Sequence, residues 1–502
     1  MPTVTEKHSV FSGDDDALLG VCGVDLILID GELHMVVGGA ATGAMSLYSL
    51  SADTANLVDT MDDSPTSGTA YMADFQVFED TTMGAAIIPF GRADDGATLL
   101  NLSGDGIETP QTDLFEGAPV TNAHQITVGE VVTHKGSSLI FYANSTGDGV
   151  HRLEVQENGS MVEKATFADD ETLPLGDVSA IASYYQKGKA YVVAASGFDD
   201  GIAVFKVGGL GNLVFKAQIE PGDGSGFDTI SAMTVVDTGA LKFLVVAASG
   251  SNSLTVYEIG SGANLFETDH ILDSGTTRFQ NVTELVGFDL NGRAFVIAAG
   301  SDDGFTLFEV LPGGTLFSHE TLIDDFDTAL TNISDLDVFI AGEMITLAVA
   351  SEGENGISLF EIDMSDIDAP IIGTNRHDTS LVGDGGNNVI DGKRNSDHLF
   401  GEGGDDILVD GAGKDYMTGG AGTDIFRFVD DGRRDLILDF EQNIDLIDLS
   451  QIGGIYAFSD LEITLSGNVT IIKGGGETVR IWTEDQTPIP TDYWSEDDFI
   501  FA

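Results

Sequence analysis

Acidic side chains that could bind a metal ion recur every nine residues between Gly383 and Arg427. This stretch divides into nine-residue units that begin at Gly383, Gly392, Gly401, Asp410 and Gly419. The sixth residue of each unit is an aspartate or its amide: Asn388, Asp397, Asp406, Asp415 and Asp424. The eighth residue is always apolar: Ile390, Leu399, Leu408, Met417 and Phe426. Oxygen ligands at a fixed spacing are what a hard cation such as Ca²⁺ requires, so the stretch predicts a calcium site.

The remaining residues of each unit explain how these side chains are positioned. Glycine dominates the first four positions, including Gly401, Gly403 and Gly419, and it permits a turn with positive φ. The last three residues form a short strand whose eighth-position side chain points into a core. Two units then make one coil of a parallel β-roll, so units two apart stack, and their carboxylates and turn carbonyls converge on one cation. A cage of about six oxygen ligands suits Ca²⁺ and does not suit zinc.

The pattern resembles the nonapeptide repeat of the RTX family of secreted, calcium-binding proteins. A flexible Gly/Asp-rich linker would not keep an apolar residue at every ninth position. The chain departs from the family pattern at Asn388, which replaces a carboxylate, and at Asn395, which replaces a turn glycine. A looser sixth copy, with Asp378 at position six, precedes the other units. The resemblance implies metal ligands at Asp378, Asn388, Asp397, Gly401, Gly403, Asp406, Asp415, Gly419 and Asp424.

A second repeat, with a period of 51 to 53 residues, occupies residues 1 to 365. Its turn glycines are Gly43, Gly96, Gly149, Gly201, Gly304 and Gly356, with Ser253 in the fifth place. In the sixth copy, the turn pair Asn291-Gly292 precedes the strand-like run Arg293–Ala299. Such pairs between apolar runs are strong hairpin signals. Four antiparallel strands in each of seven copies predict an all-β chain, in which a seven-bladed β-propeller precedes the parallel β-roll.

The two ends of the propeller are expected to meet in one blade. The seventh copy has three strands, and equal spacings match Thr3–Phe11 to its missing outer strand. The blades resemble the lactonase-type, or YVTN-like, propeller family through the stretches Phe243–Tyr257 and Tyr191–Phe205. The resemblance implies a shared blade architecture more than a shared chemistry, because that family includes sugar-lactone hydrolases, cycloisomerase-like enzymes and many binding modules.

Two residues at the channel end of the blades are candidates for catalysis. His124 stands where three other blades carry Ser or Thr, and an imidazole titrates near neutral pH, so it is a candidate general base. Arg278 is a candidate for holding a carboxylate or an oxyanion. The alternative is a polar channel rim that binds water and caps strand ends. The sequence completes no catalytic set, so whether the protein is an enzyme stays open.

Composition and the chain ends narrow the classes of function. The 502 residues carry a formal charge of −62, which argues against nucleic acid as a partner and favours cations. Cys22 is the single cysteine, so no internal disulfide forms. The first residues lack the features of a cleaved secretory signal, and no apolar run is long enough to span a membrane. The ending Glu496–Ala502 resembles the uncleaved signal of type I secretion, and an ordinary last strand is the alternative.

Together these patterns predict an extracellular calcium-binding protein exported by type I secretion. We expect a propeller at residues 1–365, the roll and its closing segment (Asp435–Phe440 with Asp445–Ser450) at 366–450, and a C-terminal β cap with a secretion signal at 451–502. The propeller is expected to be a binding or matrix-interaction module. The alternative is a secreted hydrolase or lyase acting on a sugar lactone or sugar acid in the channel. The expected partners are calcium, the secretion machinery and an extracellular glycan or matrix protein.

Overall fold

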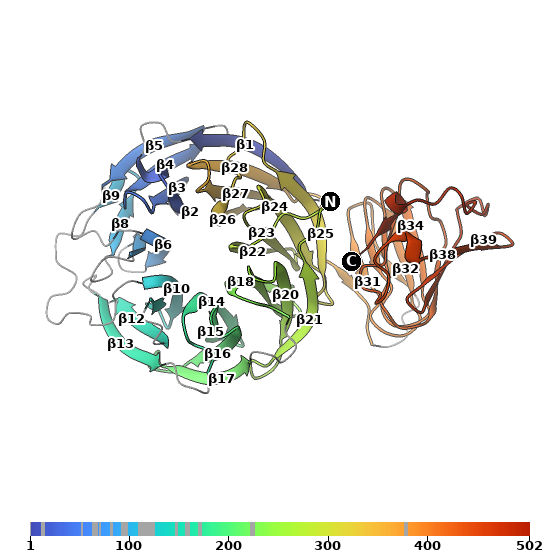
Figure 1. The fold of residues 1–502 in the computed structure, drawn as a ribbon, viewed down its shortest axis with the longest axis horizontal. Coiled ribbons are helices and arrows are strands. Elements are labelled where there is room, and N and C mark those ends of the chain that lie inside the picture. The colour runs from blue at the N-terminus through green and yellow to red at the C-terminus, as the bar shows by residue number, and fades with distance from the viewer. Residues whose placement is uncertain are drawn as a thin grey trace. The chain divides into compact units, whose positions relative to one another are not determined.

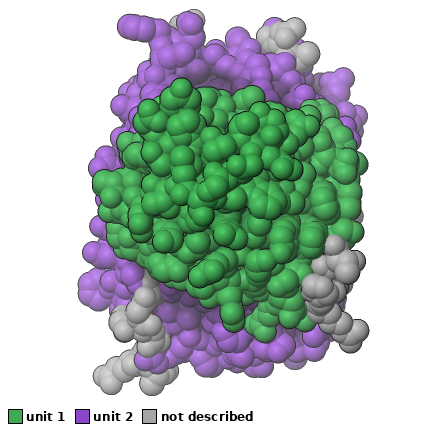
Figure 2. Space-filling view, turned by 90° about the vertical axis from the view of Figure 1, so that its right-hand side faces the viewer, with its two compact units in different colours: residues 1–2, 290–293, 364–502 green, residues 3–289, 294–363 purple. Residues whose placement is uncertain are grey.

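The computed structural model of the protein describes residues 2–11, 16–51, 54–62, 69, 72–80, 84–91, 99–108, 126–145, 149–155, 161–168, 173–220, 226–375 and 380–501. The chain divides into two compact units, shown in different colours in Figure 2: residues 3–289 with 294–363, and residues 1–2, 290–293 and 364–502. The fold is all-β, with short 3-10 turns η1 (Asp16–Leu18), η2 (Phe458–Asp460) and η3 (Glu496–Asp498). Among the described residues, no helix has the length and apolarity needed to cross a membrane.

The first unit is a ring of four-stranded antiparallel sheets that are arranged as blades around a centre (Figure 1). From the inner to the outer strand, blade one has β2 (Val21–Ile29), β3 (Glu32–Gly39), β4 (Met45–Ser51) and β5 (Thr54–Met61). Blade two has β6 (Met72–Asp80), β7 (Gly84–Gly91), β8 (Leu100–Ser103) and β9 (Gly106–Glu108). Blade three has β10 (Ile126–His134), β11 (Ser137–Asn144), β12 (Gly149–Val155) and β13 (Met161–Ala168).

The next three blades repeat this order. Blade four has β14 (Val178–Gln186), β15 (Lys189–Ser196), β16 (Gly201–Val207) and β17 (Leu213–Ile219). Blade five has β18 (Ile230–Asp237), β19 (Lys242–Ala248), β20 (Ser253–Ile259) and β21 (Leu265–Leu272). Blade six has β22 (Glu284–Leu290), β23 (Arg293–Ala299), β24 (Gly304–Val310) and β25 (Leu316–Ile323).

Blade seven joins the two ends of the ring. Its first three strands are β26 (Ile333–Ala341), β27 (Met344–Ser351) and β28 (Gly356–Asp363), and its outer strand is β1 (Thr3–Phe11). β1 runs antiparallel to β28, from Thr3 opposite Asp363 to Phe11 opposite Gly356. The seven-bladed propeller predicted from the repeat is therefore confirmed, and a strand from the beginning of the chain completes its last blade.

Turn chemistry and buried apolar runs explain why these residues form blades. Asn291 and Gly292 have φ values of 53° and 78°, and Lys187 and Gly188 have values of 51° and 69°. Two successive positive φ values are what a two-residue type I′ hairpin needs. β23 is buried along its whole length, and one hydrophobic cluster combines residues of β19 and β23 from neighbouring blades. Blades therefore pack face to face, which explains why their second strands read as continuous apolar runs.

Hydroxyl groups link neighbouring blades where the inner strands begin. The hydroxyl oxygen donates to a carbonyl of the next blade in the pairs Ser179–Ile230 (2.6 Å), Ser231–Val282 (2.6 Å), Thr283–Ile333 (3.0 Å) and Ser334–Val21 (2.8 Å). The recurrent Ser or Thr near the start of the inner strands thus closes the ring, and this structural role favours the polar-rim interpretation of these positions.

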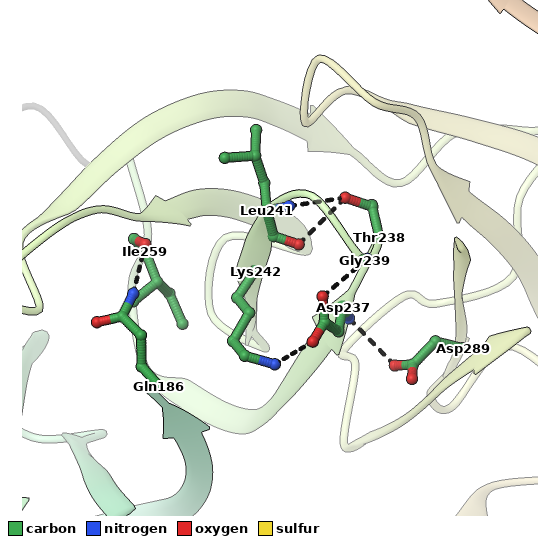
Figure 3. A network of polar contacts seen from close by, with 8 residues as sticks. All are labelled: Gln186, Asp237, Thr238, Gly239, Leu241, Lys242, Ile259 and Asp289. Atoms are coloured by element: carbon green, nitrogen blue, oxygen red, sulfur yellow. Dashed lines mark hydrogen bonds and ion pairs between the residues drawn. The ribbon is translucent and has the colours of Figure 1, made fainter. Parts of the chain in front are cut away.

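Figure 3 shows a second link between blades, at the first turn of blade five. The Asp237 backbone N–H donates to Asp289 Oδ1 of blade six at 3.1 Å. The Asp237 side chain pairs with Lys242 and accepts a hydrogen bond from the Gly239 N–H at 2.8 Å. One aspartate therefore shapes its own hairpin while its backbone contacts the neighbouring blade.

The second unit contains a parallel β-roll made of two sheets. One sheet has the order β29 (Ile371–Ile372), β31 (Val389–Asp391), β33 (Ile407–Val409), β35 (Ile425–Arg427), β37 (Leu446–Asp448), β41 (Phe499–Ile500). The other has the order β30 (Leu381–Val382), β32 (His398–Gly403), β34 (Tyr416–Ala421), β36 (Arg434–Ile437), β40 (Glu477–Ile481), β39 (Val469–Gly474), β38 (Glu462–Ser466). Leu399 pairs with Met417 and Leu408 pairs with Phe426, in parallel register. The predicted stacking of units two apart is confirmed.

The core of the roll collects the eighth-position side chains. Ile390, Leu399, Leu408, Met417 and Phe426 are all fully buried in one cluster. Residues from the end of the chain complete that cluster, among them Phe440, Trp494 and Phe499. The last strand, β41, pairs with β37 so that Phe499 lies opposite Ile447. The segment that resembles a secretion signal is therefore part of the folded sheet.

Candidate metal centre

Left-handed backbone occurs at two positions of the nonapeptide turns. In the third unit these are Glu402 (φ 75°) and Gly404 (φ 98°), and in the fifth unit they are Gly420 (φ 107°) and Gly422 (φ 143°). Positions two and four therefore use the positive φ that glycine permits. Asn395, at position four of the second unit, adopts φ 82°. The asparagine that departs from the family pattern thus keeps the turn, because its short polar side chain tolerates this conformation.

Glycine at position one has a different purpose, which is space. A Cβ added to Gly401 would lie 2.2 Å from Asp406 Oδ2, and one added to Gly419 would lie 2.2 Å from Asp424 Oδ2. Both glycines therefore keep open the space beside a carboxylate oxygen. Gly403, at position three, meets no such constraint, since the nearest atom to an added Cβ is the Ala421 carbonyl oxygen at 3.6 Å.

The sixth-position side chains form two columns, each running from coil to coil. In each step a backbone N–H donates to Oδ1 of the aspartate in the next coil. The first column joins Asn388 to Asp406 (2.7 Å), Asp406 to Asp424 (3.0 Å) and Asp424 to Asp445 (3.1 Å). The second joins Asp397 to Asp415 (2.7 Å) and Asp415 to Asp435 (2.9 Å). One oxygen of each carboxylate therefore holds the coils in register.

The other carboxylate oxygen is left for a ligand. Oδ2 of Asp406, Asp415 and Asp424 is buried and accepts no hydrogen bond from the described residues. Burial raises the pKa of Asp406 and Asp415 to about 7 and the pKa of Asp424 to about 6, and neighbouring carboxylates add to the rise. A buried, unpaired carboxylate oxygen is unfavourable unless a cation or a proton neutralises it. The hard oxygen donors, their charge and the space kept by glycine together fit calcium.

The remaining predicted ligands occupy different places. Asp397 is fully buried at the start of the second column. Asn388 Oδ1 accepts a hydrogen bond from the Asp384 N–H at 2.8 Å, so this amide completes its own turn. Asp378 lies outside the described residues.

Sequence reasoning missed Asp435 and Asp445, which extend the two columns beyond the nonapeptides. They lie 20 and 21 residues after Asp415 and Asp424, because the turns of the closing segment are longer than those of the repeat. Each is followed by two apolar residues, as Asp406 and Asp424 are. The motif of an aspartate before two apolar residues, rather than the exact spacing, was the signal that could have found them.

Comparison with known families agrees with this geometry. Residues 374–408 and 391–426 match the model of the RTX calcium-binding nonapeptide repeat (4 copies). No curated protein matches the chain. The molecule is thus a seven-bladed propeller followed by a parallel β-roll at the matched residues. The chain carries RTX calcium-binding nonapeptide repeats, whereas the lactonase-type resemblance of the propeller stays a prediction.

The structure gives the other polar candidates local roles. Arg278 lies just before β22, and its Nη1 donates to the Thr277 carbonyl at 2.8 Å. Asp177, Asn281 and Asn332 stand two residues before the hydroxyl residues Ser179, Thr283 and Ser334, and their φ values are 53°, 49° and 52°. These residues therefore suit left-handed turns, as a strand-capping rim requires. His124 lies outside the described residues.

Acidic residues on the innermost strands form a group that the sequence did not single out. Its members are Asp25, Asp74, Glu130, Glu284, Asp335 and Asp337. Three of them accept hydrogen bonds from the next blade, in the pairs Asp335–Val24 (2.7 Å), Asp337–Leu26 (2.6 Å) and Asp25–Val77 (2.9 Å). These carboxylates satisfy backbone N–H groups at the inner edge of the ring, around the centre seen in Figure 1.

Burial and mutual repulsion disfavour the charged form of this group. Burial raises the pKa of Asp74 and Asp337 to about 7. The pKa values of Glu284, Asp335 and Asp25 lie well above the ordinary range, first because of burial and then because of neighbouring carboxylates. Asp335 and Glu284 each repel Asp74 across the ring, so blades six, seven and two contribute to one acidic centre.

We expect the stability of the propeller to fall as pH rises from about 4 to about 7. In this window the folded state binds more protons than the unfolded chain, because the folded pKa values are raised to about 7 from 3.8. Thermal unfolding followed by far-UV circular dichroism, at constant calcium, measures the effect. Asp335→Asn is expected to raise the Tm at neutral pH and to flatten the pH dependence. A Tm that rises with pH over this window would contradict the assignment.

Proposed function

We propose that the protein is an extracellular calcium-binding protein that type I secretion exports, with the propeller as its recognition module. The observation that carries this proposal is the pair of aspartate columns, with their buried Oδ2 atoms, inside RTX repeats. Calcium ligands are proposed at Asp397, Asp406, Asp415 and Asp424, together with the turns that contain Gly401, Gly403 and Gly419. Asn388 and Asp378 flank this set.

Calcium concentration then decides when the roll folds. At the low free calcium of the cytosol, uncompensated carboxylates repel one another and oppose folding. Outside the cell, calcium binding supplies folding free energy. Bound calcium would also stabilise an exported chain in place of disulfides, because the single cysteine, Cys22, cannot form an internal one.

Residues 451–502 are proposed to be both the cap of the roll and the export signal. In the folded unit, β41 is paired with β37, and the Asp498 carboxylate accepts a hydrogen bond from the Ser495 N–H at 2.8 Å. A signal in this segment is therefore accessible to the secretion machinery only while the roll is unfolded. Folding outside the cell would hide it and hinder backward movement of the chain.

Export is expected to slow when the first column loses two carboxylates. Asp406→Ala combined with Asp424→Ala is compared with wild type in a host that carries a type I apparatus, and the secreted fraction is measured over time. Glu343→Gln is the control, because it removes an exposed acid from the turn between β26 and β27, outside the nonapeptides. Equal export of the double variant and the control would overturn the role of calcium in export.

The recognition surface of the propeller is proposed on the face where the inner strands begin. Phe198 lies in the turn between the second and third strands of blade four, and Phe326 lies between blades six and seven; their exposed fractions are 79% and 104%. In an antiparallel blade, the turn between the second and third strands and the connection from the fourth strand to the next blade lie on the same face, which is the face where the inner strands begin. Exposed aromatic side chains of this kind suit sugar rings or a protein partner.

Binding to an array of extracellular glycans and matrix proteins tests this surface. Phe198→Ala combined with Phe326→Ala is expected to lose the signal. Leu210→Ala is the matched control, because Leu210 is 88% exposed but lies in the turn between the third and fourth strands, on the opposite face. Turnover of a lactone panel by the wild-type protein, abolished by His124→Ala, would replace recognition with catalysis.

A further inference from the structure

Asp410 departs from the other nonapeptides at position one. The other units begin with Gly383, Gly392, Gly401 and Gly419. In the units of Gly401 and Gly419, an added Cβ would lie 2.2 Å from Oδ2 of the unit's own position-six aspartate. In the fourth unit, position one is Asp410, so a side chain that is itself a carboxylate stands beside Asp415.

Three buried carboxylates meet at this point. Oxygen atoms of Asp410, Asp415 and Asp435 all lie within 4.8 Å of one another. The residues are 2%, 0% and 3% exposed. Asp415 and Asp410 belong to the repeat, whereas Asp435 belongs to β36 in the closing segment. The cluster therefore joins two parts of the chain that the nonapeptide pattern does not connect.

Hydrogen bonds position the cluster without neutralising it. Asp410 Oδ1 accepts the Val429 N–H at 3.0 Å, and Asp435 Oδ1 accepts the Asp415 N–H at 2.9 Å. Asp415 Oδ1 accepts the Asp397 N–H at 2.7 Å. Asp415 Oδ2 is buried and accepts no hydrogen bond from the described residues. A fully buried oxygen in a group of three carboxylates is the feature that a bound cation would satisfy.

Three cations of the nonapeptides contact other groups. Arg427 Nη1 pairs with Asp448 at 2.8 Å, and Lys393 pairs with Asp391 at 2.8 Å. Lys414 Nζ lies over the Tyr416 ring, 4.5 Å from its centre. No ion pair to Asp410, Asp415 or Asp435 occurs among the described residues.

We propose that Asp410, Asp415 and Asp435 bind one Ca²⁺ ion at a site that differs from the RTX sites, because position one contributes a side-chain carboxylate. The proposal rests on calcium binding by the roll, as proposed above. The ion holds the closing segment against the nonapeptides, since one ligand comes from β36 and two come from the fourth unit. Calcium binding and docking of the closing segment are then one event.

A neighbouring acidic group has a different character. Asp431 and Glu477 share Asp435 as a neighbour within 4.8 Å. Backbone groups around the turn before β36 donate to both: Asp431 Oδ2 accepts the Gly413 N–H at 2.7 Å, and Glu477 Oε1 accepts the Asp431 N–H at 2.7 Å. This second group shapes the turn before β36 and is left out of the proposed site.

Calcium titration calorimetry of the full chain tests the proposal. Asp410→Gly removes one ligand carboxylate and leaves the space that glycine keeps in the other units, so it is expected to raise the Kd of one site by roughly tenfold or more. Asp410→Asn keeps the acceptor for the Val429 N–H but removes the charge, and it is expected to weaken one site by roughly tenfold. Glu462→Ala, which removes an exposed acid of β38 outside the nonapeptide turns, is expected to bind as wild type does.

The outcomes separate this site from the calcium function as a whole. If both Asp410 variants bind the wild-type number of ions with wild-type affinity, Asp410 only supports the turn and the proposal is overturned. If Asp410→Gly fails to fold, Asp410→Asn decides, because a merely structural Asp410 predicts unchanged binding for that variant. If the wild-type chain binds no calcium, the proposed function fails, and this inference fails with it.

Discussion

Replacing Asp406 and Asp424 together by asparagine is expected to stabilise residues 364–502 without calcium and to remove their stabilisation by calcium. Asparagine keeps the Oδ1 acceptors that hold the coils in register at 2.7 and 3.0 Å. Burial raises the pKa of the Asp406 carboxyl to about 7 and that of the Asp424 carboxyl to about 6, so their charged forms are unfavourable in the folded unit. Asparagine removes these charges, and the calcium-free unit therefore becomes more stable at neutral pH. It also removes calcium ligands, so the stabilisation by calcium is lost, roughly 3 kcal/mol per site at calcium a hundredfold above Kd.

Urea unfolding followed by tryptophan fluorescence measures this change in the full chain. Both tryptophans, Trp482 and Trp494, lie in the roll unit, so their emission reports on that unit and not on the propeller. Glu462→Ala, which removes an exposed acid outside the nonapeptide turns, provides the control for a lost negative charge. An equal calcium-dependent shift of the unfolding midpoint in wild type and double variant would contradict the assignment of the columns as calcium ligands.

Asp448→Ala is expected to destabilise the same unit by about 3–5 kcal/mol, whether or not calcium is present. Asp448 Oδ2 lies 2.8 Å from Arg427 Nη1, and the two side chains are 0% and 2% exposed. Removing the carboxylate breaks the ion pair of a buried guanidinium. Arg427 ends β35 and Asp448 ends β37, so the break lies between adjacent strands of one sheet.

The matched control for this prediction is Glu462→Ala. Glu462 forms an ion pair with Lys473 in the same unit, but the two side chains are 67% and 48% exposed. Exposed pairs contribute little to stability, so the midpoint of tryptophan-detected unfolding is expected to stay at the wild-type value. A similar small effect for Asp448→Ala would show that the buried pair does not hold the sheet together.

The sequence predicts the architecture because its signals are local and repeated. Turn pairs such as Asn291-Gly292 indicate the hairpins of the blades. The apolar eighth residue of each nonapeptide indicates which side chains face the core of the roll. The pairing of Thr3–Phe11 with blade seven could be read from equal spacings at the two ends of the repeat. Repetition makes these signals strong, because each copy needs the same backbone geometry.

Acidic residues that are far apart in the sequence and close together only in the fold could not be predicted in this way. Asp25, Asp74 and Asp335 belong to different blades, and nothing in their spacing shows that they share one acidic centre. Asp435 lies 20 residues after Asp415, which breaks the nonapeptide count although the side chain continues the column. The sequence shows that Asp410 replaces the glycine found at position one of the other units, but only the fold shows that its carboxylate lies close to those of Asp415 and Asp435.

The most direct test of the account is tryptophan emission of the wild-type chain as a function of free calcium at physiological ionic strength. Calcium, and not magnesium at the same concentration, is expected to move Trp494 from a solvated to a buried environment, since Trp494 belongs to the core that the aspartate columns hold in register. Trp482 is half-buried in the same unit and is expected to change less. Magnesium prefers a small octahedral cage and retains its water, so it is expected to be a poor substitute. Emission and urea midpoint that are the same with and without calcium would contradict the account.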